Sequence, residues 1–210
     1  MKLTLFSQNL LPAHLDKIKT YFDKPLSEVR FLYINTAGNY KPYKSEWMTS
    51  GEKRWQEVFP IFQEFDIERA YRVDNNFDFK TFISSYDYIF VGGGNIFLLS
   101  YWMNKTGAKE IIKGLVLNNK VIYGGASAGA VFTMKDISFC DSLDEPTLAK
   151  ERINNGLGLL DFVLLPHWNN PEMQTEIENI DKNFKEQGTK TYRITDDQAL
   201  FTDSTKVEVI

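Results

Sequence analysis

Cysteine and histidine are scarce in this chain. Its 210 residues include one cysteine, Cys140, and two histidines, His14 and His167. A single cysteine excludes an internal disulfide and a zinc site made of several cysteines. We interpret Cys140 as a half-buried, reduced thiol. With only two histidines, the choice of a catalytic imidazole is narrow.

Long apolar runs and blocks of basic residues are also missing. No apolar run approaches the ~18 residues that a membrane span requires, and the N-terminus lacks the apolar region and cleavage site of a signal peptide. The 24 basic and 28 acidic residues give a net charge of −4, without a Lys/Arg block that would contact phosphates. We expect a cytoplasmic protein that binds neither membranes nor nucleic acid.

The composition is that of a folded globular protein, with 43% hydrophobic and 25% charged residues. The length suits one domain over residues 1–210 with a substantial core. Short apolar segments alternate with longer amphipathic ones. The segments predicted as strands are 2–6, 29–37, 67–73, 86–91, 120–125, 161–168, 191–195, 198–202 and 206–210. Those predicted as helices are 10–22, 50–65, 77–85, 95–104, 108–118 and 171–187.

This alternation predicts an α/β fold, a mostly parallel sheet with helices on both faces. Ser50 and Asn170 are expected to cap their helices, and Pro60 to kink or interrupt the helix at 50–65. Ligands of such folds bind at the carboxyl ends of the strands. Residues that directly follow predicted strands are therefore the first candidates for a functional site.

One such stretch is GASAG at 125–129, which fits G-x-S-x-G between a predicted strand and helix. This is the context of a nucleophile elbow, in which small neighbours permit a tight turn around Ser127. The amide of Ala128, at the start of the helix, could donate to a developing oxyanion. The alternatives are a tight turn without chemistry and an anion-binding glycine loop.

A serine nucleophile requires a base. His14 is predicted in an early helix beside Lys17 and Lys19, and we interpret it as a surface residue. His167 ends the strand-like run DFVLLP at the edge where Ser127 is expected to emerge. Between the two, His167 is the candidate base.

The carboxylate that would orient the imidazole is not fixed by spacing. An acidic loop between Ser127 and His167 offers Asp136, Asp141, Asp144 and Glu145. The later stretch TDDQAL supplies two competitors at another strand end, Asp196 and Asp197. Acidic loops are also common on solvated surfaces.

A glycine run follows a further predicted strand, in FVGGGN at 90–95. Its amides could approach a ligand closely and form the second half of an oxyanion hole, or the glycines could simply permit a turn. Neither G-x-G-x-x-G nor G-x-x-x-x-G-K-[ST] occurs, which disfavours a nucleotide cofactor.

Together, FVGGGN, GGASAGAV and LLPHWNN resemble, in order and spacing, peptidase family S51, whose best-known member is the aspartyl dipeptidase dipeptidase E. The resemblance implies a serine hydrolase related in fold to class I glutamine amidotransferases, without metal or other cofactor. It places the nucleophile at Ser127 and the base at His167. The acid falls on Asp144 in the stretch DEP, with Asp141 and Asp197 as alternatives.

The same resemblance assigns the oxyanion hole to Gly93 or Gly94 with Ala128. It implies hydrolysis of short peptides, such as dipeptides with N-terminal aspartate. We expect the protein to be a monomer or a homodimer. Asn95, Trp168 and the aromatic loop after Ala37 are candidates for substrate binding, and Arg152 and Arg193 for a substrate carboxylate. Other readings are an esterase or amidase with a different small-molecule substrate, and a non-catalytic binding protein on the same scaffold. An amidotransferase is disfavoured because its nucleophile is normally cysteine.

Overall fold

The computed structural model describes residues 1–40 and 46–210, with the backbone alone for residues 46–49. The central sheet has seven strands in the order β3-β2-β4-β5-β1-β8-β9. The strands are β1 (Leu3–Phe6), β2 (Phe31–Ile34), β3 (Phe62–Phe65), β4 (Tyr88–Val91), β5 (Ile122–Ala126), β8 (Ala199–Thr202) and β9 (Val207–Val209). Neighbours from β3 to β1 pair in parallel, whereas β8 pairs antiparallel with β1 and β9. The predicted mostly parallel sheet is confirmed.

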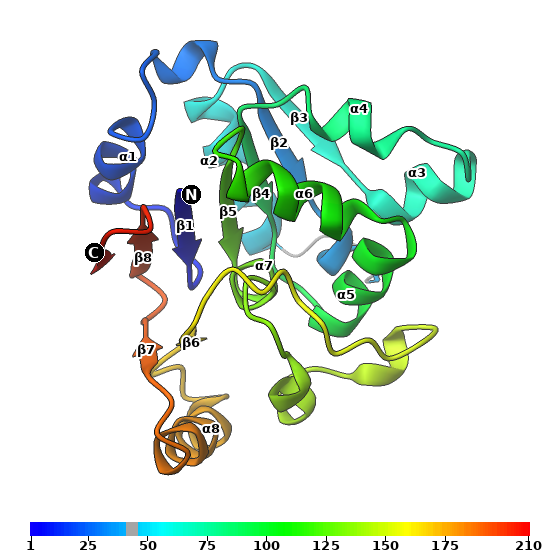
Figure 1. Ribbon diagram of the computed structural model, residues 1–210. Helices are drawn as coiled ribbons and strands as arrows, with labels where there is room; N and C mark the ends of the chain where they lie inside the picture. The colour runs from blue at the N-terminus through cyan, green and yellow to red at the C-terminus, as the bar shows by residue number, and fades with distance from the viewer. Residues whose placement is uncertain (41–45) are drawn as a thin grey trace.

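Two hydrophobic clusters cover the two faces of this sheet because successive strand residues point to opposite sides. On β2, Phe31 and Tyr33 belong to a cluster that includes side chains of α1 (Pro12–Lys19) and α2 (Glu46–Val58). Leu32 and Ile34 belong to the larger cluster on the other face. Figure 1 shows α6 in front of the sheet and α2 behind it, which confirms helices on both faces.

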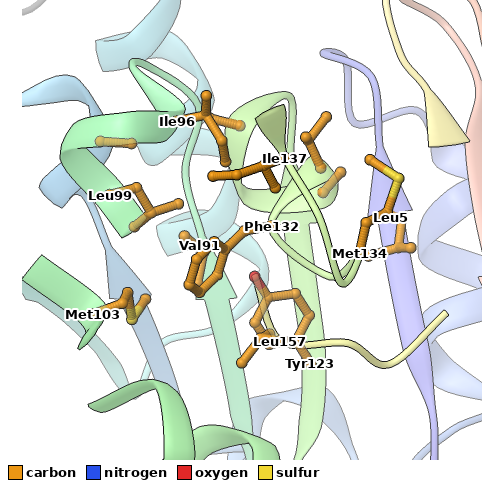
Figure 2. Close-up of a cluster of buried hydrophobic side chains, with 14 of the residues drawn as sticks. Leu5, Val91, Ile96, Leu99, Met103, Tyr123, Phe132, Met134, Ile137 and Leu157 are labelled. Carbon is orange, nitrogen blue, oxygen red and sulfur yellow. The ribbon is translucent and has the colours of Figure 1, made fainter. Parts of the chain in front are cut away.

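The larger cluster packs the sheet against five helices and the chain that follows Ser127. These helices are α3 (Ile67–Val73), α4 (Phe79–Ile83), α5 (Ile96–Lys105), α6 (Ala108–Leu117) and α7 (Ala128–Val131). Figure 2 shows Val91 and Tyr123 of the sheet together with Leu99 of α5 and Phe132 after α7. The Tyr123 hydroxyl donates to the Gly129 carbonyl oxygen at 2.7 Å, which ties α7 to β5.

A separate layer lies beyond the carboxyl edge of the sheet. It contains the parallel pair β6 (Val163–Leu165) and β7 (Thr191–Arg193), with α8 (Gln174–Glu186) between them in sequence. Figure 1 shows these elements below the central sheet. The helix predicted from Pro171 begins three residues later, at Gln174, so Asn170 does not cap it. The Asn170 side chain instead accepts from the Glu172 amide in the preceding turn.

Two element predictions are wrong. Residues 67–73, expected as a strand, form α3, which the Asp66 carboxylate caps by accepting from the Glu68 amide at 3.0 Å. The expected helix at 50–65 is instead α2, which begins at Glu46 and ends at Val58, so Ser50 lies inside the helix and does not cap it. Phe62–Phe65 form β3 on the sheet edge. Proline lacks the N–H that an extended helix would need, so Pro60 separates the two elements.

The interpretation of His14 as a surface residue is also wrong. His14 is 1% exposed, and its ring packs edge-on against Phe6 at a centroid distance of 5.4 Å. Nδ1 accepts from the Leu11 amide at 3.1 Å, and Nε2 lies 3.2 Å from the Ile210 carbonyl oxygen. His14 is therefore a core residue. Because both of its ring nitrogens have backbone partners, it also links α1 to the C-terminal residue Ile210. Cys140 is free, as expected, but buried rather than half-buried.

Candidate active site

Ser127 occupies a tight turn between β5 and α7. Its backbone has φ 50° and ψ −116°, a region that non-glycine residues rarely adopt. A Cβ on Gly125 would overlap the backbone of Gly129, and a Cβ on Gly129 would overlap the Val91 carbonyl group. The glycines on either side of Ser127 are thus required by close packing of α7 on the sheet.

His167 directly faces Ser127. It follows β6 after one proline and has a left-handed backbone, with φ 59°. Its Nε2 lies 2.9 Å from Ser127 Oγ, within hydrogen-bonding distance. His167 therefore meets the geometric requirement for a base acting on this hydroxyl, since a base must lie within about 2.6–3.2 Å of the atom that carries the proton it removes.

Asp196 is the carboxylate that contacts the imidazole. Its Oδ1 lies 2.6 Å from His167 Nδ1. Because an ionised carboxylate only accepts hydrogen bonds, the neutral imidazole is protonated at Nδ1 and presents the lone pair of Nε2 to Ser127. This tautomer is the one required for removal of the Ser127 proton. The His167 side chain is 12% exposed and that of Asp196 31%.

Ser7 is a contact of this group that the sequence did not reveal. Its hydroxyl donates to Asp196 Oδ1 at 2.8 Å, and it accepts from the His167 backbone N–H at 2.7 Å. The only available signal was its position directly after the predicted first strand. That signal is weak, because a serine after a strand is common in turns.

Asp144, the acid expected from the family resemblance, does not hydrogen-bond to the imidazole in the structure. Its Oδ2 accepts from the Ile96 backbone N–H at 2.8 Å, at the start of α5. Burial raises the pKa of the Asp144 carboxyl, while the Ile96 N–H and the charge of His167 act in the opposite direction. Asp196, one of the competitors that spacing left open, is instead the carboxylate that is hydrogen-bonded to the imidazole.

The other acidic candidates have different partners. Asp141 pairs with Arg152 at 2.8 Å, and Asp197 accepts from the Asn9 side chain at 2.9 Å. Asp136 and Glu145 each accept from a backbone amide two residues further along the chain. These four side chains therefore have other protein partners, and none is hydrogen-bonded to His167.

The glycine run after β4 lies against the segment that follows β2. The Gly92 amide donates to the Ile34 carbonyl oxygen at the end of β2, and the Asn95 amide donates to the Ala37 carbonyl oxygen in that segment, both at 2.8 Å. Within residues 1–40 and 46–210, the amides of Gly93, Gly94 and Ala128 donate to no protein acceptor. These three N–H groups are the ones that the resemblance assigns to an oxyanion hole.

Two residues expected to bind substrate have structural partners. Asn95 is 2% exposed, and it caps α5 through the Leu98 amide while donating to the Glu145 carbonyl oxygen. Both ends of its amide group therefore have a protein partner. Trp168 stacks against Arg193, whose guanidinium lies 4.6 Å from the ring centre.

The two expected cations are likewise engaged. Arg193 pairs with Asp181 at 2.8 Å, and Arg152 pairs with Asp141 and lies over the Phe97 ring. Most of the aromatic loop expected after Ala37 falls outside the described residues. Both arginines therefore already have a carboxylate partner in the structure.

A cavity of about 90 Å³ adjoins the glycine run and the end of β5. Its lining includes the aromatic residues Tyr33, Trp55 and Phe90. Arg54 is the only charged residue along its described lining. No carboxylate in the described ranges pairs with Arg54. The lining consists of Gln8, Asn9, Leu10, Tyr33, Ser50, Gly51, Arg54, Trp55, Phe90, Gly93 and Ala126. Neither this lining nor that of a larger groove of about 720 Å³ beside α8 includes Ser127, His167 or Asp196, but only the smaller cavity adjoins Gly93 and Ala126.

Comparison with known proteins decides the family. The sequence pattern of peptidase family S51 matches residues 5–210. This chain belongs to peptidase family S51. The Listeria monocytogenes protein called uncharacterized peptidase Lmo0363 is 28% identical over 183 residues, which cover 87% of this S51 chain and 86% of the relative. An uncharacterized peptidase of Pasteurella multocida is 34% identical over 85 residues, 39% of this chain and 40% of the relative.

Solved structures agree with this assignment. The crystal structure of a candidate peptidase E from Listeria monocytogenes superposes with a TM-score of 0.82 and 26% identity, over 100% of this chain and 97% of the other. A peptidase from an acI-B1 actinobacterium shares the fold, with a TM-score of 0.66 and 19% identity over 100% of this chain and 86% of that one. The expected three-layer fold of the class I glutamine amidotransferase type is thus confirmed, and the S51 protein is a serine peptidase.

The described residues hold neither a candidate metal site nor a candidate membrane-spanning helix. No group of three His, Cys, Asp or Glu side chains in the ranges 1–40 and 46–210 is arranged to hold a metal ion. Among the same residues, no helix has the length and apolar character needed to cross a membrane.

Proposed function

We propose that this S51 peptidase hydrolyses short peptides with Ser127 as nucleophile, His167 as general base and Asp196 as the carboxylate that orients His167. The observation that supports this most directly is the continuous hydrogen-bonded chain from Ser127 Oγ through both imidazole nitrogens to Asp196 Oδ1. Such a chain activates a hydroxyl that is otherwise a poor nucleophile at neutral pH.

In the proposed reaction, His167 Nε2 takes the Ser127 proton as Oγ attacks the peptide carbonyl carbon. The negative charge on the carbonyl oxygen is stabilised by the amides of Ala128 and of Gly93 or Gly94, which have no protein acceptor in the described part of the chain. The protonated Nε2 then donates to the leaving amine, and the C–N bond breaks. Water, deprotonated by Nε2, hydrolyses the acyl-enzyme and restores Ser127.

For the substrate, we propose peptides that present a carboxylate to Arg54, such as dipeptides with N-terminal aspartate. The support is the cavity beside Gly93 and Ala126, which adjoins the candidate oxyanion hole and has Arg54 as its only described charge. Its volume of about 90 Å³ suits a small side chain rather than an extended peptide. A guanidinium can bind a carboxylate through two parallel hydrogen bonds.

Replacement of the nucleophile is the first test. We expect Ser127→Ala to lower kcat by several powers of ten with an unchanged melting temperature, because only the chemical step is lost. A fluorophosphonate probe should label Ser127 in the unmodified protein, as mapped by mass spectrometry. Wild-type turnover of Asp-X dipeptides by Ser127→Ala would refute the proposal. Labelling of Ser127 without peptide cleavage, but with ester cleavage, would point to an esterase on the same scaffold.

Arg54→Gln tests the substrate assignment. We expect kcat/KM for Asp-X dipeptides to fall about ten- to one hundredfold, because a hydrogen bond to a charged group contributes roughly 1.5–3 kcal/mol. Cleavage of the matched Asn-X dipeptides should change little. Lys53→Gln is the control, since Lys53 is the neighbouring exposed cation and does not line the cavity. Equal losses on Asp-X and Asn-X would contradict a contact between Arg54 and a carboxylate.

A further inference from the structure

Ser7 connects two parts of the site that are far apart in sequence. It directly follows β1, is completely buried, and its backbone N–H donates to the Gln198 carbonyl oxygen at 3.2 Å. Its hydroxyl contacts both His167 and Asp196. Ser7 is thus fixed to the end of a central strand while its side chain reaches the imidazole and its carboxylate.

The Ser7 hydroxyl donates one hydrogen bond and accepts another. The single hydroxyl proton goes to Asp196 Oδ1 at 2.8 Å, and a lone pair accepts from the His167 backbone N–H at 2.7 Å. Ser7 Oγ also lies 3.4 Å from His167 Nδ1, at the limit of hydrogen-bonding distance. Asp196 Oδ1 therefore accepts hydrogen bonds from both Ser7 and His167. These two bonds fix the position of the carboxylate relative to the imidazole ring.

The backbone of His167 depends on the same contact. Its φ of 59° is a left-handed conformation that is unfavourable for residues other than glycine. The bond from the His167 N–H to Ser7 satisfies a donor that the adjoining strand pairs do not use. Without it, this half-buried N–H would lack a protein acceptor, and the turn that aims the ring at Ser127 would lose a constraint.

We propose that Ser7 is a positioning residue, which holds the Asp196 carboxylate and the His167 imidazole in line with Ser127. It acts through these two residues and does not contact the reacting atoms. The proposal rests on the proposed roles of Ser127, His167 and Asp196 in peptide hydrolysis. Its specific consequence is that the loss of one buried hydroxyl reduces turnover without altering substrate binding.

The test compares Ser7→Ala with Ser100→Ala. Ser100 is equally buried, and its hydroxyl donates to the Asn155 carbonyl oxygen, away from the three catalytic candidates. We expect Ser7→Ala to lower kcat by about ten- to one hundredfold with KM within about twofold, because a small misplacement of reacting groups costs up to ~100-fold in rate. Ser100→Ala should keep the wild-type kcat.

A second readout does not depend on turnover. The proton shared between His167 Nδ1 and Asp196 should give a far-downfield NMR resonance, assigned by its loss in His167→Gln. We expect this resonance in the wild type and in Ser100→Ala, and its broadening or loss in Ser7→Ala. A Ser127→Ala protein with no activity would still show it. Failure of the peptidase assignment is therefore distinguishable from failure of the Ser7 assignment.

The outcomes separate positioning from a purely structural role. If folded Ser7→Ala keeps the wild-type kcat and the downfield resonance, the proposal is overturned, even if the melting temperature falls. If Ser7→Ala does not fold, Ser7→Cys replaces it, because the thiol fills the same space but is a weak donor and acceptor. Folded Ser7→Cys with lowered kcat and a weakened resonance would support the proposal, and unchanged values of both would refute it.

Discussion

At the residue scale, the site depends on which carboxylate meets the imidazole. Asp144 and Asp196 are both near His167, but their surroundings differ. Asp144 is directed to a helix amide and its pKa is raised by burial, whereas Asp196 bonds directly to Nδ1 at 2.6 Å. A carboxylate that orients imidazole must be ionised and in contact with Nδ1. Asp196 satisfies the contact requirement and Asp144 does not.

This difference predicts unequal effects of two isosteric substitutions. Asp196→Asn should lower kcat on the order of ten thousandfold, because an amide can donate to Nδ1 and so favour the wrong imidazole tautomer. Asp144→Asn should reduce kcat less than about tenfold, because the Asn oxygen can still accept from the Ile96 amide. Steady-state kinetics on one dipeptide would decide. A larger loss in Asp144→Asn would return the role to the acidic loop.

At the scale of elements, the geometry of the nucleophile follows from the packing of α7 on β4 and β5. Ser127 is held at φ 50° by a helix whose Gly129 is pressed against the Val91 carbonyl group. The strained turn persists because the surrounding backbone leaves no space for relaxation. The small residues around Ser127 therefore have a structural as well as a chemical reason.

Two glycine substitutions should consequently have opposite effects on stability. Gly129→Ala should lower the free energy of unfolding by at least about 1–3 kcal/mol, since the new methyl group overlaps backbone atoms that cannot move aside. Gly114→Ala, inside α6 with no atom within 4 Å of the added Cβ, should raise it by ~0.5–1 kcal/mol. Urea unfolding would measure both. A neutral Gly129→Ala would show that α7 is not tightly packed.

At the scale of the whole molecule, the site draws on both ends of the chain. Ser7 and Asp196 are 189 residues apart, yet their side chains are hydrogen-bonded. They meet because β8 runs antiparallel to β1, which pairs Phe6 with Ala199 and brings the start of β8 to the carboxyl edge of the parallel strands. The contact between His14 of α1 and the Ile210 carbonyl oxygen lies at the same edge, because Ile210 pairs with Ala199.

His14 makes this contact dependent on pH. Burial lowers the pKa of His14 below its ordinary value of 6.5, while bonds to backbone groups and the charge of Asp197 oppose the shift. Its Nδ1 accepts from the Leu11 amide, so protonation would break that bond. Since the folded pKa is the lower one, its contribution to stability is complete above about pH 6.5 and declines as the pH falls through the folded value.

We therefore expect the free energy of unfolding to decrease as the pH is lowered from 7.5 to 5.5. The decrease should be smaller in His14→Gln. The difference between the two proteins isolates His14 from the other titrating groups. Urea unfolding at both pH values is the measurement, with activity of the refolded samples as a control for integrity. An identical pH dependence in both proteins would show that His14 is not held neutral in the folded state.

The sequence by itself determined the class of fold, the turn at Ser127 and the choice of His167 over His14. These depend on local patterns: apolar runs, glycines next to one serine, and the end of a strand. It did not determine that His14 is buried, that Asp196 rather than Asp144 meets the imidazole, or that Ser7 contacts both His167 and Asp196. Only the tertiary structure decided these, because each depends on the antiparallel return of β8 and on the pairing of segments far apart in the chain.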